Sequence, residues 1–154
     1  MKNKERIKTD LLREVLLNGS TFRYRALGGS MSPFIKAGSV LTVKKVEKIL
    51  VGDVVVYRRK GEFIAHRVIK KTHDGGEVFL VTKGDNLFYK DEPIEEDQIL
   101  GKVVRVEKQG KTISMNCFSS NILNRLLALL SPCVLPHMLA KLRKIKSLVV
   151  KDRL

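Results

Sequence analysis

Hydrophobic and polar residues alternate along the central part of this chain in short runs, and glycines or charged residues separate the runs. Alternation with a period of two is typical of strands that bury one face. The pattern predicts seven strands: Phe22–Ala26, Val40–Val43, Val54–Arg58, Phe63–Lys71, Val78–Thr82, Leu100–Glu107 and Thr112–Met115. Hairpin turns are predicted at Lys60-Gly61, Gly75-Gly76 and Gln109-Gly110. Short strands with regular turns predict a mainly β fold, a compact barrel or sandwich.

Both ends of the chain follow a helical pattern instead. Apolar residues within Thr9–Leu17 lie three and four positions apart, and Asn18-Gly19 is placed to end that helix. Apolar residues return to helical spacing from about Ser119, with lysines and arginines between them. We therefore expect three regions: an N-terminal helix over 1–20, a β core over 21–117 and a basic amphipathic helical tail over 118–154.

Charge narrows the expected partners. The 154 residues carry a formal net charge of +14, which suits either nucleic acid or an anionic membrane surface. Aromatic residues are only 6% of the chain, and no nucleic-acid-binding motif accompanies the charge, so nucleic acid is not the expected partner. The tail over 118–154 fits contact with an anionic membrane, or equally a helix packed on the β core with its lysines in solvent.

Targeting and redox signals are weak. The N-terminus does not read as a secretory signal, because acidic residues interrupt it and no long apolar run follows. The apolar stretch Leu126–Ala140 contains two prolines and is shorter than the roughly 20 residues that span a bilayer. Cys117 and Cys133 lack metal-ligand spacing, so we expect buried or idle thiols in a reducing compartment. These features predict a cytoplasmic or peripheral membrane protein.

Three segments carry candidate chemistry. The glycines before Ser30 permit a tight path that exposes its hydroxyl and leaves backbone N–H groups free for an oxyanion. His66 lies inside a predicted strand and is able to accept a serine proton near neutral pH. Asp85 and Asp91 supply carboxylates that orient such a histidine. Taken singly, these segments read more often as a loop, a satisfied strand histidine and a turn.

In this order, however, the segments resemble type I signal peptidases from about Phe22 to Glu107. The shared motifs are the Gly-Ser-Met-x-Pro box at 29–33, the Gly-Asp-hydrophobic strand at 51–57, His-Arg-Val-Ile at 66–69, the acidic box at 84–91 and Gly-Lys-Val at 101–103. Most bacterial members carry lysine where this chain has His66. The chain is therefore similar to the archaeal, endoplasmic-reticulum and sporulation-type members.

The resemblance implies a signal peptidase-like β core and a serine endopeptidase. Ser30 would attack the scissile carbonyl, and His66 would take the proton and return it to the leaving amine. Either Asp85 or Asp91 would orient His66, with Asp91 favoured. The implied substrate is a leader or signal-like peptide, bound in extended form with small residues before the cut. No metal or organic cofactor is implied.

The resemblance also implies where the oxyanion hole lies. Its donors would be the backbone N–H of Ser30 and a neighbour, so Gly29, Met31 and Ser32 are the expected oxyanion or substrate-positioning residues. Many bacterial members carry Ser or Thr two residues before the nucleophile, where this chain has Gly28. Because losing an oxyanion donor costs about 3 kcal/mol of barrier, this departure predicts lower activity unless another donor substitutes.

Two alternatives stay open. A LexA-type self-cleaving protein shares the β fold and the Ser-Met box, but it uses lysine as base and carries a DNA-binding domain before the peptidase. The residues before Phe22 are too few for such a domain, and His66 stands at the base position. The other alternative is an inactive relative that binds membranes or nucleic acid.

Overall fold

The computed structural model describes residues 2–115, which form one α-helix, one short 3-10 helix and eight strands. In chain order these are α1 (Lys2–Leu17), β1 (Thr21–Arg25), β2 (Val40–Lys44), β3 (Val54–Arg59), β4 (Glu62–Asp74), β5 (Glu77–Lys83), β6 (Ile94–Glu95), η1 (Glu96–Gln98), β7 (Ile99–Lys108) and β8 (Lys111–Ser114). The expected tail over 118–154 and both cysteines lie outside the described residues. Neither helix of the described part has the length and apolar character that crossing a membrane requires.

Hydrophobic alternation located the strands well. All seven predicted strands are present, and their ends differ from the predicted ends by at most three residues. The pattern missed β6 and η1, which at two and three residues are too short to show any period. The N-terminal helix begins earlier than predicted, at Lys2, but it ends at Leu17 as expected. Gly19 follows with a φ of 77°, the left-handed conformation that ends many helices.

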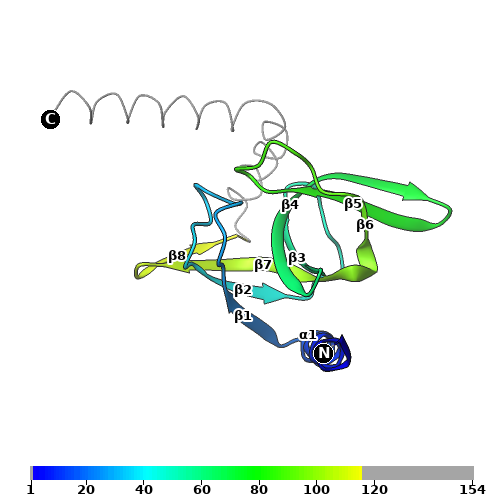
Figure 1. Ribbon diagram of the computed structural model, residues 1–154, viewed down its shortest axis with the longest axis horizontal. Helices are drawn as coiled ribbons and strands as arrows, with labels where there is room; N and C mark the ends of the chain where they lie inside the picture. Colours follow the sequence, from blue (N-terminus) through cyan, green and yellow to red (C-terminus); the bar gives the residue numbers. More distant parts are fainter. Residues whose placement is uncertain (1, 116–154) are drawn as a thin grey trace, which may run out of the picture.

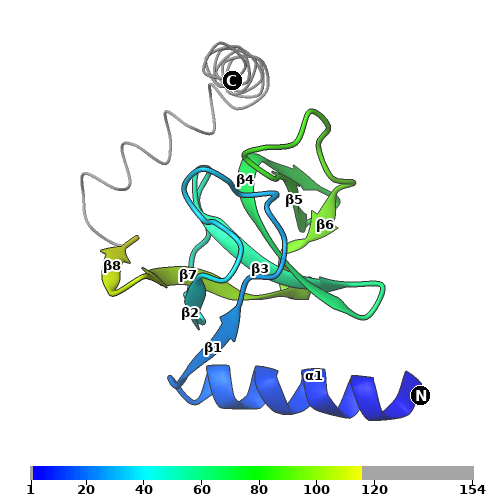
Figure 2. The ribbon, with the colours of Figure 1, turned by 60° about the vertical axis from the view of Figure 1, so that its left-hand side comes forward.

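The strands form a single antiparallel sheet in the order β1-β2-β7-β3-β4-β5-β6, and β8 pairs with the outer part of β7. The hairpins β4–β5 and β7–β8 extend in opposite directions from its centre (Figure 1). The sheet is strongly curved, and α1 lies alongside β1 on one side of it (Figure 2). This architecture confirms the mainly β fold class.

The hairpin turns were also predicted correctly. Lys60 and Gly61 join β3 to β4 with φ angles of 50° and 87°, which matches a tight turn with two left-handed residues. The pairs Gly75-Gly76 and Gln109-Gly110 join the other two hairpins in the same way. The first turn fixes the register of β3 on β4, which places Val55 opposite His66.

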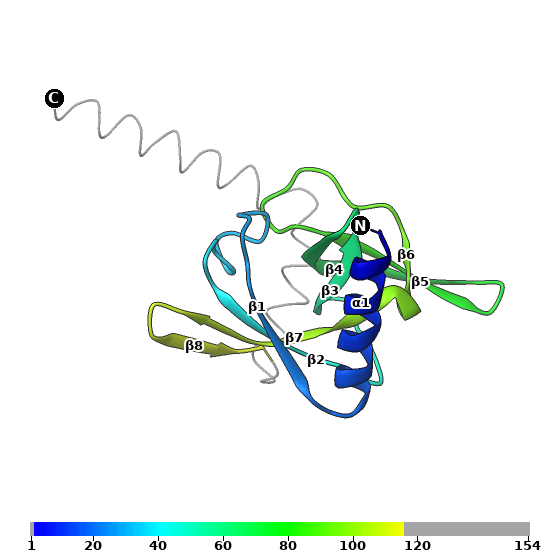
Figure 3. The ribbon, with the colours of Figure 1, turned by 60° about the horizontal axis from the view of Figure 1, so that its bottom comes forward.

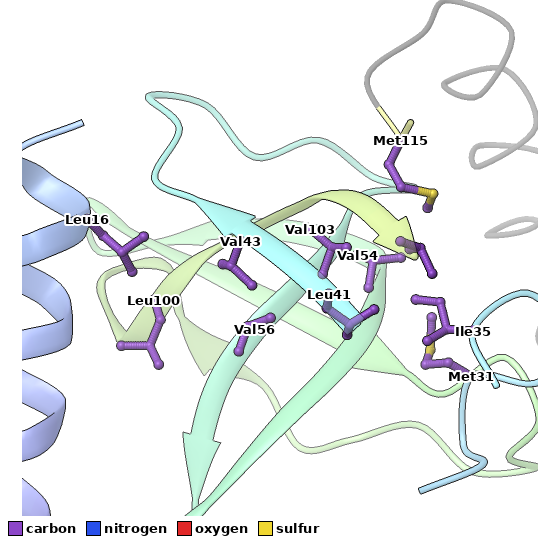
Figure 4. Packing of buried hydrophobic residues seen from close by; sticks show 11 residues of the cluster. Leu16, Met31, Ile35, Leu41, Val43, Val54, Val56, Leu100, Val103 and Met115 are labelled. Carbon is purple, nitrogen blue, oxygen red and sulfur yellow. The ribbon is translucent and has the colours of Figure 1, made fainter. Parts of the chain in front are cut away.

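Strand β3 is buried on both faces, so the sheet has two hydrophobic clusters. Val54 and Val56 point into the first cluster, whereas Val55 and Tyr57 point into the second. Figure 4 shows the first cluster, in which Leu16 enters from α1 beside the valines of β2 and β3. The helix crosses the sheet near β1 and β7 (Figure 3), and Leu16, 1% exposed, anchors it.

Candidate active site

Ser30 lies in the long connection between β1 and β2, residues 26–39. Two backbone hydrogen bonds shape the connection: Ser32 N–H donates to Gly29 O at 3.1 Å, and Ile35 N–H donates to Met31 O at 2.9 Å. The side chains of Met31 and Ile35 are buried in the first cluster (Figure 4). The connection is therefore anchored in the core directly after Ser30 and is not an open loop.

His66 lies on β4, between Ser30 and Asp91. Its Nε2 is 3.1 Å from Ser30 Oγ, and its Nδ1 is 2.6 Å from Asp91 Oδ2. The imidazole is buried, with 6% of the residue exposed. Three side chains that are far apart in the sequence thus form one continuous chain of hydrogen bonds, in the order carboxylate, imidazole, hydroxyl.

Asp91 belongs to the loop between β5 and β6, and neighbouring strands hold it. Its backbone N–H donates to Thr82 O at 2.8 Å. Its Oδ2 accepts hydrogen bonds from the Thr82 hydroxyl at 2.7 Å and from the Tyr57 hydroxyl at 3.1 Å. Partial burial acts to raise the pKa of Asp91, but the hydrogen bonds from His66, Thr82 and Tyr57 outweigh it, so the pKa lies below its ordinary value of 3.8.

Asp85, the other candidate carboxylate, binds a different partner. Both of its oxygens accept from the guanidinium of Arg67, at 2.8 and 2.7 Å, and both side chains are fully buried. Arg67 also donates to Gly52 O at 2.8 Å. Because Arg67 follows His66 on β4, the two side chains point to opposite faces of the strand. The carboxylate within hydrogen-bonding distance of His66 is therefore that of Asp91, as the sequence analysis favoured.

Residues 84–86 also hold the backbone at Ser30. Asn86 N–H donates to Ser30 O at 2.7 Å. A Cβ on Gly84 would lie 2.8 Å from the same oxygen, closer than real Cβ atoms come. Glycine at position 84 thus allows the two loops to approach each other, and the acidic segment positions the serine as well as supplying Asp91.

A groove of about 750 Å³ begins at Ser30 and His66. Its walls come from the end of β1, the connection after it, and the start of β4: Tyr24, Arg25, Ala26, Leu27, Gly28, Gly61, Glu62, Phe63, Ile64 and Ala65. Strand β1 pairs only with β2, and β5 pairs with β4 only from Arg67 onward. Within residues 2–115, the groove is therefore bordered by two strand edges that have no strand partner.

The sequence-predicted residues separate into two groups. The structure brings Ser30, His66 and Asp91 into direct contact. Gly29 and Ser32 shape the serine loop through their backbones, and Met31 anchors it in the core, as described above.

Sequence reasoning did not find Tyr57 and Thr82 as parts of the site. The pairing of β3 and β5 with β4 is what relates them to the site, because Tyr57 on β3 and Thr82 on β5 share a face with His66 on the strand between them. That relation becomes visible only once the strands are aligned.

Comparisons with known proteins agree with this arrangement. Residues 2–104 match the Peptidase S24-like family. A relative named signal peptidase complex catalytic subunit SEC11 from Clavispora lusitaniae is 44% identical over 63 residues, 39% of this chain and 38% of the relative. The protein of the same name from Pyricularia oryzae is 37% identical over 91 residues, 51% of this chain and 53% of the relative.

The chain thus spans about half the length, or less, of these curated relatives. The matches confirm the resemblance to signal peptidases of the endoplasmic-reticulum type that the sequence indicated. Because the family match extends over well more than half of the 154 residues, this chain belongs to the Peptidase S24-like family.

Proposed function

We propose that this protein is a serine endopeptidase in which Ser30 is the nucleophile, His66 the general base and Asp91 the residue that orients His66. The observation that carries the proposal is the hydrogen-bonded series Asp91 Oδ2, His66 and Ser30 Oγ, with separations of 2.6 and 3.1 Å. A serine hydroxyl is a poor nucleophile until a base lies within such a distance. Asp85 serves the fold instead, through its ion pair with Arg67.

The reaction proceeds in two halves. Ser30 Oγ attacks the carbonyl carbon of the substrate while its proton passes to His66 Nε2, giving a tetrahedral oxyanion. The C–N bond then breaks as His66 returns the proton to the leaving amine, and an acyl ester on Ser30 remains. Water loses a proton to His66, attacks the ester and releases the new carboxyl terminus, after which Ser30 regains its proton. Asp91 accepts the hydrogen bond from His66 Nδ1–H throughout and does not take the proton.

The oxyanion donors in this proposal are the backbone N–H groups of Ser30 and Met31. Neither N–H has an acceptor within the described part of the chain, whereas the N–H of Ser32 already donates to Gly29 O. Unengaged N–H groups next to the nucleophile are what a developing oxyanion requires. Gly29 and Ser32 therefore act through the shape of the loop.

The groove supports an extended peptide as substrate. A strand inserted between β1 and the start of β4 would satisfy the backbone groups of both edges and present one carbonyl to Ser30. The names of the relatives concern signal peptidases, and we propose a leader or signal-like segment as the substrate of this chain. The enzyme in this proposal uses neither a metal nor an organic cofactor.

The deciding experiment incubates the full-length protein with a serine-acylating probe and with a panel of leader-like peptides that carry small residues before the cut. Wild type is compared with Ser30→Ala and with Ser20→Ala, a control that removes an exposed serine side chain just before β1. We expect labelling and cleavage in wild type and Ser20→Ala, and loss of both in Ser30→Ala. Cleavage that survives in Ser30→Ala would refute the assignment.

Self-cleavage is the second candidate, because the S24-like family match does not specify whether the substrate is another chain. To distinguish self-cleavage from cleavage of another chain, wild-type protein is incubated alone and its intact mass is measured over time. A Ser30-dependent decrease in mass at a rate independent of protein concentration would favour self-cleavage. An unchanged mass, together with cleavage of added peptides, would favour a peptidase that acts on other chains.

We also propose peripheral contact with an anionic membrane, which would bring the site to membrane-bound precursors. The support is the basic composition of 118–154 and the net charge of +14. Flotation with vesicles of neutral lipid, and of the same lipid with anionic lipid added, tests it. Binding that requires anionic lipid and weakens with salt is expected; equal or no binding would oppose it.

A further inference from the structure

Asp91 reaches His66 from a loop and not from a strand, so other residues must fix its carboxylate. The residues that do so stand on the two strands that flank β4. Val55 lies opposite His66, which places Tyr57 diagonally across from it, and Thr82 lies opposite Val68 on the other side. Tyr57 and Thr82 thus border His66 on one face of the sheet.

Both hydroxyls converge on one atom. Asp91 Oδ2 accepts from Thr82 at 2.7 Å, from Tyr57 at 3.1 Å, and contacts His66 Nδ1 at 2.6 Å. The Tyr57 and Thr82 hydroxyls are themselves 3.2 Å apart. Tyr57 is 1% exposed and Thr82 is fully buried, so water does not replace either donor easily.

We propose that Tyr57 and Thr82 are positioning residues, whose paired hydroxyls hold Asp91 Oδ2 on His66 Nδ1 and thereby fix which imidazole nitrogen faces Ser30. The inference rests on the proposed function and extends it. An ionised carboxylate only accepts hydrogen bonds, so Nδ1 must be the protonated nitrogen wherever Asp91 is held ionised. Nε2 is then left without a proton, as a base for Ser30 requires.

The protonation state of Tyr57 and the pairing of the nearby charged groups agree with this role. Burial raises the pKa of Tyr57 well above its ordinary value, so the phenol keeps its proton and remains a donor. Other charged groups near the cluster are already engaged: Arg59 with Glu92, and Arg67 with Asp85. The buried Lys83 lies opposite Arg67 on β5 and has a partner of its own. Among these groups, only His66, Tyr57 and Thr82 donate a hydrogen bond to Asp91.

Tyr57 contributes packing as well as its hydroxyl, and the test must separate the two. Its ring lies edge-on to the imidazole, with 6.5 Å between ring centroids and an interplanar angle of 74°. Tyr57→Phe keeps that contact and removes only the hydroxyl. Thr82→Val removes the other hydroxyl and keeps the branched side chain. Thr82→Ser restores a hydroxyl and serves as the conservative rescue.

The experiment uses the full chain and measures two quantities for each variant. One is the Asp91 titration, followed by the carboxyl carbon resonance, together with the nitrogen shifts of His66 that report its tautomer. The other is kcat and KM on a peptide that wild type cleaves. Tyr89→Phe on the exposed loop and Thr72→Val at the far end of β4 are the matched controls, because neither residue touches the site.

We expect Thr82→Val and Tyr57→Phe to raise the Asp91 midpoint and to introduce the other His66 tautomer, with the larger effect for Thr82, whose bond is shorter. Each should lower kcat by roughly 10-fold, the effect of losing one hydrogen bond to a charged group, with KM little changed. Thr82→Ser and both controls should resemble wild type.

An Asp91 midpoint and a His66 tautomer that stay unchanged in both variants would overturn the inference, even if thermal stability fell. The resonance measurements need no substrate. They therefore decide the inference even if wild type cleaves no peptide, in which case only the proposed function fails. If one variant does not fold, the other still provides the comparison.

Discussion

Arg67 Nε and Nη2 bind the two oxygens of Asp85 at 2.8 and 2.7 Å in a site from which solvent is fully excluded. Arg67 is the neighbour of His66, and Asp85 precedes Asn86, which holds the backbone of Ser30. The ion pair therefore joins the strand that carries His66 to the loop that binds the backbone of Ser30. The two aspartates, six positions apart, thus bind different partners: Asp85 pairs with Arg67, and Asp91 contacts His66.

Asp85→Asn and Asp91→Asn should separate the effects of these two contacts. Asp85→Asn leaves a buried guanidinium without its counter-charge, which costs about 3–5 kcal/mol of unfolding free energy. Asp91→Asn should change stability far less and should lower kcat about 10⁴-fold, because the imidazole loses the acceptor that fixes its tautomer. Urea unfolding and peptide cleavage measure the two effects. Equal stability losses in the two variants would contradict the division.

Gly84→Ala should impair catalysis through the backbone of Ser30. The added Cβ would meet Ser30 O at 2.8 Å and force the serine loop away from His66. A displacement of about 1 Å reduces the rate roughly 100-fold. Gly101→Ala is the matched control, because its Cβ would meet Lys44 O at 2.6 Å between β7 and β2. Gly101→Ala should lower thermal stability without lowering kcat. A similar loss of kcat in Gly84→Ala and Gly101→Ala would show that displacement of the Ser30 loop is not the cause.

Gly28→Ser should raise activity. Residue 28 stands two positions before the nucleophile, and a Cβ there would meet no atom within 4 Å. A hydroxyl at this place adds a donor near the developing oxyanion, which is worth up to about 100-fold in kcat. Gly28→Ala supplies the Cβ without the hydroxyl and should not show the gain. If serine and alanine behaved alike, Ser30 and Met31 would already provide a sufficient oxyanion hole.

Stability should depend on pH through Asp91. Its pKa is lower in the folded protein than the ordinary value of 3.8, so its contribution is complete above that value and is lost as pH falls through the folded pKa. The unfolding free energy of wild type should therefore fall more steeply below about pH 4 than that of Asp91→Asn. Thr82→Val should give an intermediate slope. Identical slopes for wild type and Asp91→Asn would show that the carboxylate gains nothing from its partners.

The features that could be predicted from the sequence are those that depend on neighbouring residues, either through hydrophobic alternation or through a short motif. Alternation along β3 and β4 and the turn at Lys60-Gly61 are local, so these strands were located closely. Ser30 and His66 were singled out through motifs, and the structure brings their side chains within 3.1 Å.

The partner of Asp85 and the role of Tyr57 depend on which strands become neighbours. A sequence lists carboxylates and hydroxyls but does not state which face of which strand they share. The bulge between Val68 and Lys70, where β4 pairs with β5, adds a shift in register that alternation alone does not reveal.

The sequence separations within the site have a consequence for biosynthesis. Ser30 and His66 are 36 positions apart, and His66 and Asp91 a further 25. During translation Ser30 leaves the ribosome long before Asp91, the carboxylate that contacts His66. Because β5 and the loop after it must dock before Asp91 reaches His66, a nascent chain that ends before residue 91 lacks the carboxylate that contacts His66 Nδ1. Any reactivity of the proposed site would therefore appear only after β5 and the loop that follows it have docked.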